Sequence, residues 1–244
     1  MLTFQNPGPW QTNSIFLARA GSAAYGTKTP ESDVDYRGVF LANESQILGL
    51  NNIESYTEES PIDLQCYELR HFLKLCLKGS PLQVELLFYP NDVIESSTEI
   101  WNKILAIRNC FLGKHLKFTF GGFAQSDVKR IQGNSLAKCG AKGKLLVEKY
   151  GYNTKQASSS WRLLKMAELL WTTGELVVRL PENDRNEIIS IKQGKYTREE
   201  FLKFIQDEDT RIFKLVEKSD LPPKPDFKLV EKTMISIYRE WLKI

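Results

Sequence analysis

One segment, residues 21–38, constrains the fold more than any other part of the chain. It reads GSAAYGTKTPESDVDYRG, comes after the apolar run 14–20 (SIFLARA) and enters the apolar run 34–41 (VDYRGVFL). Both runs have the composition of β-strands, and the breakers between them predict a turn. The sequence therefore places a Gly-Ser pair directly after one strand and an Asp-x-Asp pair on the next.

The Gly-Ser pair, Gly21 and Ser22, is suited to binding phosphate. Glycine lets the backbone approach a ligand closely. If a helix begins just after it, backbone N–H groups and the Ser22 hydroxyl can cradle phosphate oxygens. A lone Gly-Ser pair has little specificity, so a phosphate site is predicted only in combination with the acidic residues of the next strand.

The aspartates Asp33 and Asp35 are predicted to share one face of a strand, because side chains alternate along a strand. Two adjacent carboxylates repel unless a cation lies between them. Oxygen ligands of this kind suit Mg²⁺, and with a third carboxylate two metal ions can clamp a phosphoryl transfer. Asp63, on a predicted strand over 62–67, is the candidate third carboxylate, and Glu68 is its nearest rival. Glu85 is another candidate, although we expect it rather to be a structural carboxylate that packs a helix or anchors a loop.

Hydrophobic periodicity predicts an α+β fold, with a mixed sheet and helices first and an all-helical part after it, divided near residue 100. The pattern predicts strands over 14–20, 34–41, 62–67 and 83–88, and a helix over 69–77. It further predicts helices over 114–130, 154–172, 183–192, 197–218 and 226–242, and a loop over 135–144.

Charge divides the chain at the same place. Residues 1–100 hold 6 Lys and Arg against 13 Asp and Glu, whereas residues 101–155 hold 11 basic side chains against two acids. Carboxylates suit divalent cations, and a basic stretch suits phosphate or nucleic acid. We therefore expect a catalytic domain over 1–100 and a basic, substrate-binding helical domain over 101–244, although a solvated lysine-rich surface would give the same composition.

The sequence indicates a cytoplasmic protein. No window approaches the roughly 18 apolar residues of a membrane-spanning helix, and the N-terminus lacks the pattern of a secretory signal. The four cysteines form no CxxC pair and there are only two histidines, so we expect reduced thiols and no zinc site.

The spacing of Gly21-Ser22, ten residues, then Asp33-x-Asp35 resembles the DNA polymerase β-like nucleotidyltransferase superfamily. The longer string GSAAYGTKTPESDVDYRGVF is similar to the RNA-repair branch, which includes the RNA-ligase-associated polymerases. The resemblance continues patchily through YELRHFLKLCLKGSP, VELLF, GYNTKQA and TTGELVV.

The resemblance implies a role for each matching residue. Gly21 and Ser22 would bind the triphosphate of an NTP, and Asp33 and Asp35 would hold two Mg²⁺ ions, with Mn²⁺ as an alternative. Asp63 would complete the second ion's shell and act on the attacking hydroxyl. The resemblance also implies an RNA substrate and an RNA ligase as a partner.

The chain departs from the branch where the branch carries histidines. The segment here reads Lys155-Gln-Ala-Ser-Ser159-Ser-Trp-Arg162, with Gln or Ser at both histidine positions. Lys155, Ser159 and Arg162 fall on one helical stripe. We expect this stripe to bind the triphosphate or the acceptor strand rather than to be a solvated face.

Arg37 is expected on the face of the aspartates, two residues after Asp35. It either neutralises their repulsion, contacts a phosphate, or forms a structural ion pair with an acid such as Glu31.

These features predict an enzyme, a Mg²⁺-dependent nucleotidyltransferase (class EC 2.7.7) that joins a nucleoside monophosphate from an NTP to an acceptor hydroxyl. An RNA 3′ end in RNA repair is the first choice of acceptor. The alternatives are a protein side chain or a small molecule as acceptor, because fold and motif do not fix the acceptor, and a catalytically degenerate nucleotide-binding module. Nucleotide preference, template dependence and oligomeric state are not determined by the sequence.

Overall fold

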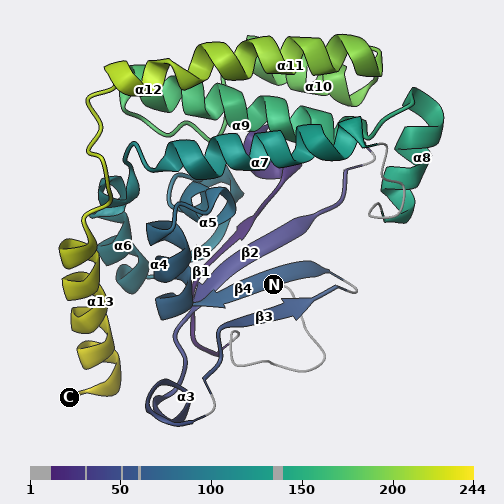
Figure 1. The fold of residues 1–244 in the computed structure, drawn as a ribbon. Coiled ribbons are helices and arrows are strands. Elements are labelled where there is room, and N and C mark those ends of the chain that lie inside the picture. Colours follow the sequence, from purple (N-terminus) through teal and green to yellow (C-terminus); the bar gives the residue numbers. More distant parts are fainter. Residues whose placement is uncertain (1–11, 31, 51, 60–61, 134–139) are drawn as a thin grey trace. The chain divides into compact units, whose positions relative to one another are not determined.

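The computed structural model describes residues 12–30, 32–50, 52–59, 62–133 and 140–244. The chain forms two compact units, Met1–Phe111 with Pro225–Ile244, and Leu112–Lys224 (Figure 1). The α+β fold class is confirmed, because a five-stranded mixed sheet with helices is followed by a part that is helical throughout its described residues.

The sheet of the first unit has the strand order β3-β4-β2-β1-β5. Its strands are β1 (Ser14–Arg19), β2 (Asp35–Phe40), β3 (Ser55–Glu58), β4 (Asp63–Glu68) and β5 (Ile94–Ser97). All neighbours are antiparallel except β2 and β4, which run in parallel. The two strands that carry the candidate carboxylates therefore start at the same edge of the sheet.

Burial increases along both parallel strands. β2 begins at the half-buried Asp35 and ends at the buried Val39 and Phe40, and β4 begins at the exposed Asp63 and ends at the buried Glu68. The starts of the two strands are thus accessible to a ligand, whereas their ends lie in the core.

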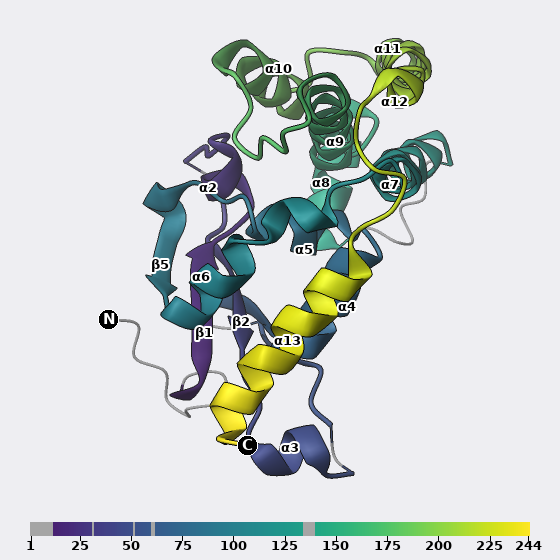
Figure 2. The same ribbon diagram turned by 90° about the vertical axis from the view of Figure 1, so that its left-hand side faces the viewer.

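Helices cover the sheet and close the first unit. They are α2 (Ser22–Tyr25), α3 (Glu44–Leu48), α4 (Leu69–Leu77), α5 (Pro81–Leu86), α6 (Glu99–Leu105) and α13 (Phe227–Leu242), with 3₁₀ turns at Asn91–Val93 and Arg108–Phe111. Phe16 of β1 stacks on Trp101 of α6 with ring centroids 4.3 Å apart, and Trp101 also contacts Phe72 of α4. The last helix, α13, packs against α4 and α6 (Figure 2), so it completes the unit that begins the chain.

The second unit is built around the 20-residue helix α9. Its helices are α7 (Leu116–Gln132), α8 (Ala141–Tyr150), α9 (Thr154–Thr173), α10 (Glu182–Lys192), α11 (Arg198–Phe213) and α12 (Leu215–Lys218). All of the other five contact α9. Asn153 caps the start of α9, and Thr197 with Glu200 forms the predicted capping box of α11, which satisfies N–H groups that lack partners in the helix.

One predicted strand is wrong. Residues 83–88 do not form a strand, because most of them lie in α5. Pro81 occupies the first helical position, where its missing N–H costs nothing, and the N–H of Val84 donates to the Ser80 carbonyl at 3.0 Å. Every residue of α5 except the apolar Leu82 is buried, so the helix has no polar face to give it a readable period.

Two boundaries in the second unit also differ from expectation. The predicted loop over 135–144 is helical from Ala141, with Gly140 as the N-cap of α8, and residues 134–139 lie outside the described residues. The predicted helix over 197–218 is divided at Lys214 into α11 and α12.

The expectations for the cysteines and for a membrane-spanning helix can be compared with the described residues only. No described helix has the length and hydropathy needed to cross a membrane. Cys66, Cys76 and Cys110 are free thiols, and burial raises the pKa of Cys66 to about 12. Cys139 lies outside the described residues.

Candidate active site

Gly21 and Asp35 are in direct contact. The N–H of Ala20 donates to the Asp35 carbonyl at 2.7 Å, which ties the end of β1 to the start of β2. Gly21 has φ +60°, and a Cβ at this position would lie 2.6 Å from Asp35 Oδ2. Only glycine combines this backbone conformation with this approach, so the carboxylate lies directly against the backbone from which α2 begins at Ser22.

Asp35 and Asp63 are paired across neighbouring strands. They are opposite each other in the parallel register of β2 and β4, so their side chains share one face on strands about 4.8 Å apart. Asp33 is exposed and lies two residues before β2, so the expected position of Asp33 on the strand is not found. The structure brings together Gly21, Ser22, Asp35 and Asp63 at one edge of the sheet.

Arg37 contacts the third carboxylate rather than lying free between the first two. Its Nη1 donates to Asp63 Oδ1 at 3.0 Å and to the Tyr36 carbonyl at 2.7 Å. The Asp63 side chain is 54% exposed and that of Arg37 is 23% exposed, so this ion pair contributes little to stability. Its effect is to orient Asp63. Glu31, the partner suggested by the sequence, lies outside the described residues.

Buried polar groups support this edge of the sheet. Tyr25 of α2 donates its hydroxyl to Glu85 Oε2 of α5 at 2.8 Å, and Glu85 is completely buried. Tyr67, on the Asp63 face of β4, interacts with Gln83 of α5, and burial raises its pKa. These contacts anchor α2 and β4 to α5, in agreement with the structural role expected for Glu85.

Glu68, the rival of Asp63, has a structural position at the opposite end of β4. Its Oε2 accepts the N–H of Arg70 at 2.7 Å and that of His71 at 3.4 Å, which caps α4. Its Oε1 accepts the hydroxyl of Tyr238 on α13. Because Glu68 lies on the other face of β4 from Asp63 and has these partners, it is not placed to join Asp35.

Lys192 lies near the basic stripe of Lys155, Ser159 and Arg162, which the sequence did not indicate. Lys155 is exposed, Ser159 is half-buried and Arg162 is buried along α9. Thr154 donates its hydroxyl to the carbonyl of Lys192 at 2.9 Å, which holds the end of α10 at the start of α9. Burial and the charges of Lys155 and Arg162 lower the pKa of Lys192. No periodicity links 192 to 155, so only the tertiary structure could reveal this cluster.

The described residues contain no group of three or more His, Cys, Asp or Glu side chains arranged to hold a metal ion. Asp63 contacts Arg37, a cation that the chain itself supplies. Asp35 and Asp63 nevertheless present carboxylate oxygens from adjacent strand positions.

Comparison with known protein families gives a match over most of the chain. Residues 9–226 match the model of RlaP, described as the RNA repair pathway DNA polymerase beta family. An uncharacterised 38.9 kDa protein from the nrdC–mobD intergenic region of enterobacteria phage T4 is 30% identical over 131 residues, covering 48% of this chain and 39% of that protein. The chain thus spans about two-fifths of the length of this relative.

Among solved structures, a nucleotidyltransferase-like protein from Exiguobacterium sibiricum 255-15 matches 93% of this chain and 74% of its own. The identity is 12% and the TM-score is 0.29. The family assignment therefore comes from the sequence match.

Proposed function

The chain belongs to the RNA repair pathway DNA polymerase beta family, and on that premise we propose that it transfers a nucleoside monophosphate from an NTP to the 3′-hydroxyl of an RNA. One observation carries most of the support: Asp35 lies against Gly21 and opposite Asp63. A phosphate-binding turn and two carboxylates at one sheet edge are what such a transfer requires.

The donor set fits Mg²⁺. Mg²⁺ prefers oxygen ligands and is commonly held by one or two carboxylates, with water and substrate phosphates completing its shell. Asp35 and Asp63 supply such oxygens, and the exposed Asp33 lies two residues before Asp35; these three would hold two ions, either Mg²⁺ or Mn²⁺. Bound there, the ions would neutralise phosphate charge and lower the pKa of the attacking hydroxyl.

The residues of the chain divide the remaining work. Gly21, Ser22 and the start of α2 would hold the triphosphate. Asp63, oriented by Arg37, would accept the proton of the 3′-hydroxyl. The bond from the 3′-oxygen to the α-phosphorus forms as the bond from that phosphorus to the bridging oxygen breaks, and pyrophosphate leaves with the electron pair.

The helical part is assigned to substrate binding. Lys155, Ser159 and Arg162 would contact phosphate groups, with Lys192 as a fourth member of their cluster. The basic stretch 101–155 would track the RNA backbone. We assign catalysis to the unit that carries the sheet, Met1–Phe111 with Pro225–Ile244, and substrate binding to the unit Leu112–Lys224. We place the protein in the cytoplasm, with an RNA ligase as partner.

The test mixes the protein with each α-labelled NTP, Mg²⁺ and a short RNA with a 3′-hydroxyl, beside Asp35→Asn as the control. Products are resolved on a denaturing RNA gel and on a protein gel. A longer labelled RNA that depends on Asp35 supports the proposal and identifies the nucleotide. Label on the protein points to the other acceptor, and absence of label from every product contradicts the assignment as an RNA polymerase.

A further inference from the structure

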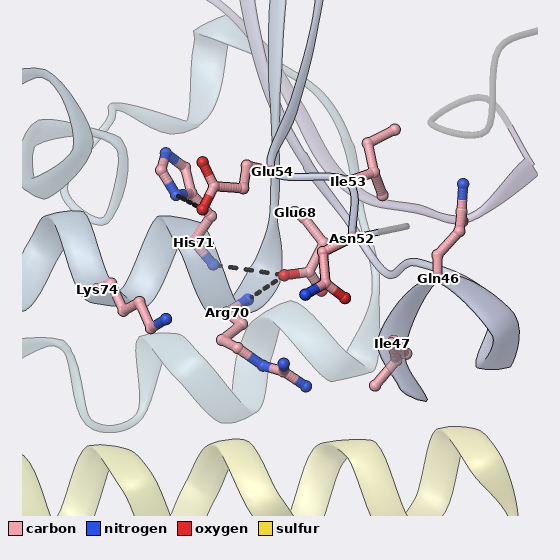
Figure 3. Close-up of a pocket in the computed structure, with 9 residues that line it drawn as sticks. All are labelled: Gln46, Ile47, Asn52, Ile53, Glu54, Glu68, Arg70, His71 and Lys74. Atoms are coloured by element: carbon pink, nitrogen blue, oxygen red, sulfur yellow. Dashed lines mark hydrogen bonds and ion pairs between the residues drawn. The ribbon is translucent and has the colours of Figure 1, made fainter. Parts of the chain in front are cut away.

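A polar pocket lies at the end of β4 opposite to Asp63. Residues from α3, from the segment before β3, from the end of β4 and from α4 surround an open space of about 400 Å³, part of which is continuous with solvent (Figure 3). Five residue steps along β4 separate Asp63 from Glu68, which corresponds to about 16 Å. The pocket is therefore distinct from the edge that carries Asp35 and Asp63.

Two cations in this pocket have no acidic partner. Arg70 and Lys74 lie four residues apart on α4, so they project from the same side of the helix. Among the described residues neither forms an ion pair, and the guanidinium of Arg70 instead lies 5.4 Å from the ring centre of Tyr238. Two cations without an ion-pair partner among the described residues, beside one opening, can bind an anion.

The two carboxylates of the pocket lie in different settings, one held by the fold and one largely exposed. Glu68 accepts two backbone N–H groups and the Tyr238 hydroxyl, so its oxygens face the start of α4 and α13. Glu54 lies 3.7 Å from Nδ1 of His71 (Figure 3). Among the described residues, neither of them forms an ion pair with Arg70 or Lys74.

The remaining lining suits a phosphate ester. Asn52 is exposed and its amide has no hydrogen-bond partner among the described residues, so it can donate to an anion. Ile47 and Ile53 give the pocket an apolar wall, against which a sugar or base can pack. A phosphate accepts several charged hydrogen bonds at once, and a nucleotide unit joins such an anion to an apolar ring.

We propose that this pocket binds the phosphate group of a nucleotide unit, held by Arg70, Lys74 and Asn52. The unit belongs either to a free nucleotide or to an RNA strand, which share this chemistry. The proposal goes beyond the transfer reaction, because the pocket would bind phosphate whether or not the chain catalyses that reaction.

The test monitors the backbone amides by ¹H–¹⁵N NMR while inorganic phosphate, AMP or a five-nucleotide RNA is added to the full chain. We expect shifts at residues 52–54 and 70–74, and Lys74→Gln or Asn52→Ala should weaken binding at these amides about tenfold. Saturation by RNA at lower concentration than AMP identifies the strand as the source, and the reverse order identifies a free nucleotide.

Lys78→Gln is the matched control, since Lys78 is exposed at the end of the same helix but does not line the pocket. Arg70→Gln removes the contact with Tyr238 as well, so its melting temperature is measured beside its binding, and Lys74→Gln decides the outcome if Arg70→Gln is unfolded. Shifts that appear only around Gly21 and Asp35, or that are equal in wild type, Lys74→Gln and Lys78→Gln, overturn the proposal. Because the readout is local and needs no catalysis, failure here is distinguishable from failure of the transfer assay.

Discussion

The two ends of β4 carry the same chemical group in opposite settings. At the start, Asp63 is exposed and is held by one arginine side chain opposite Asp35. At the end, Glu68 is buried and accepts two backbone N–H groups and a tyrosine hydroxyl. A carboxylate whose partners are all fixed parts of the fold is committed to structure, whereas one held by a side chain at the surface can exchange that partner for a ligand.

The same contrast separates Asp35 from Glu85. Asp35 is half-buried and lies against Gly21, while Glu85 is completely buried and accepts the hydroxyl of Tyr25. Burial of a charge is costly unless hydrogen bonds compensate for it. Exposure and partner, rather than residue type, therefore distinguish the proposed catalytic acids, Asp35 and Asp63, from the acids with structural contacts, Glu68 and Glu85.

The largest effect should come from Asp35→Asn. This change removes a carboxylate charge where the phosphates and metal ions would bind but keeps the size of the side chain, so transfer should fall by about 10³-fold with little change in melting temperature. Single-turnover assays and thermal unfolding measure the two quantities. Transfer at close to the wild-type rate would remove Asp35 from the functional acids.

The contrast between the two ends of β4 predicts that Asp63→Asn lowers activity and that Glu68→Ala lowers stability. Asp63→Asn should lower transfer about 10²-fold and leave stability nearly unchanged, because the side chain is exposed. Glu68→Ala leaves buried donors without an acceptor, so it should cost about 1–3 kcal/mol of unfolding free energy. Denaturant titrations and transfer assays on both variants measure the two effects. The contrast between the two carboxylates is wrong if Asp63→Asn lowers mainly stability and Glu68→Ala lowers mainly transfer.

Gly21→Ala tests whether the close contact between Gly21 and Asp35 is needed for transfer. The added Cβ would collide with Asp35 Oδ2, so transfer should fall at least about tenfold through displacement of the carboxylate. Gly174→Ala is the control, because Gly174 has φ +77° with nothing within 4 Å of the added Cβ. Gly174 has a left-handed helical backbone, so Gly174→Ala should lose about 1 kcal/mol of stability. Gly21 has φ 60° and ψ −134°, a conformation that essentially only glycine adopts, so Gly21→Ala should lose more. Equal transfer rates in the two variants would show that the contact with Asp35 does not matter.

The smallest effect is expected for Lys192→Met, which replaces a partly buried cation of the helical unit. The pKa of Lys192 is lower in the folded chain than its ordinary 10.5. Its protonated form therefore costs stability below the folded pKa, and this cost disappears as the pH rises toward 10.5. Lys192→Met should accordingly be slightly more stable than wild type at pH 7, and this difference should vanish near pH 10.5.

The same variant should bind NTP about two- to fivefold more weakly, a loss that a purely structural lysine would not show. Lys195→Met is the control for stability, because Glu187 raises the pKa of Lys195 and its replacement should not stabilise the protein. Thermal unfolding at both pH values and nucleotide titrations give the two readouts. Unchanged NTP binding by Lys192→Met would leave Lys192 outside the phosphate-binding cluster.

Much of the secondary structure was predictable because its signals are local. The apolar stripe of α4, the capping box of α11 and the long pattern of α9 all depend on residues within a few turns of one another. The prediction failed at α5, where every residue except the apolar Leu82 is buried, so no polar face marks a helical period and only Ser80 and Pro81 signal the helix. Single turns and short strands such as α3, β3 and β5 were not predicted, since few residues carry too weak a pattern.

By itself, the sequence determined that a Gly-Ser turn comes after one strand and that acidic residues open the next, because both features lie within eighteen residues. Only the tertiary structure decided that Asp35 lies against Gly21 and that Arg37 donates a hydrogen bond to Asp63. It also decided that Glu68 accepts the hydroxyl of Tyr238 on the last helix. It also joined Lys192 to Lys155 and Arg162. These contacts join residues that are distant in sequence. They depend on strand register and burial, and no local sequence pattern encodes either of these.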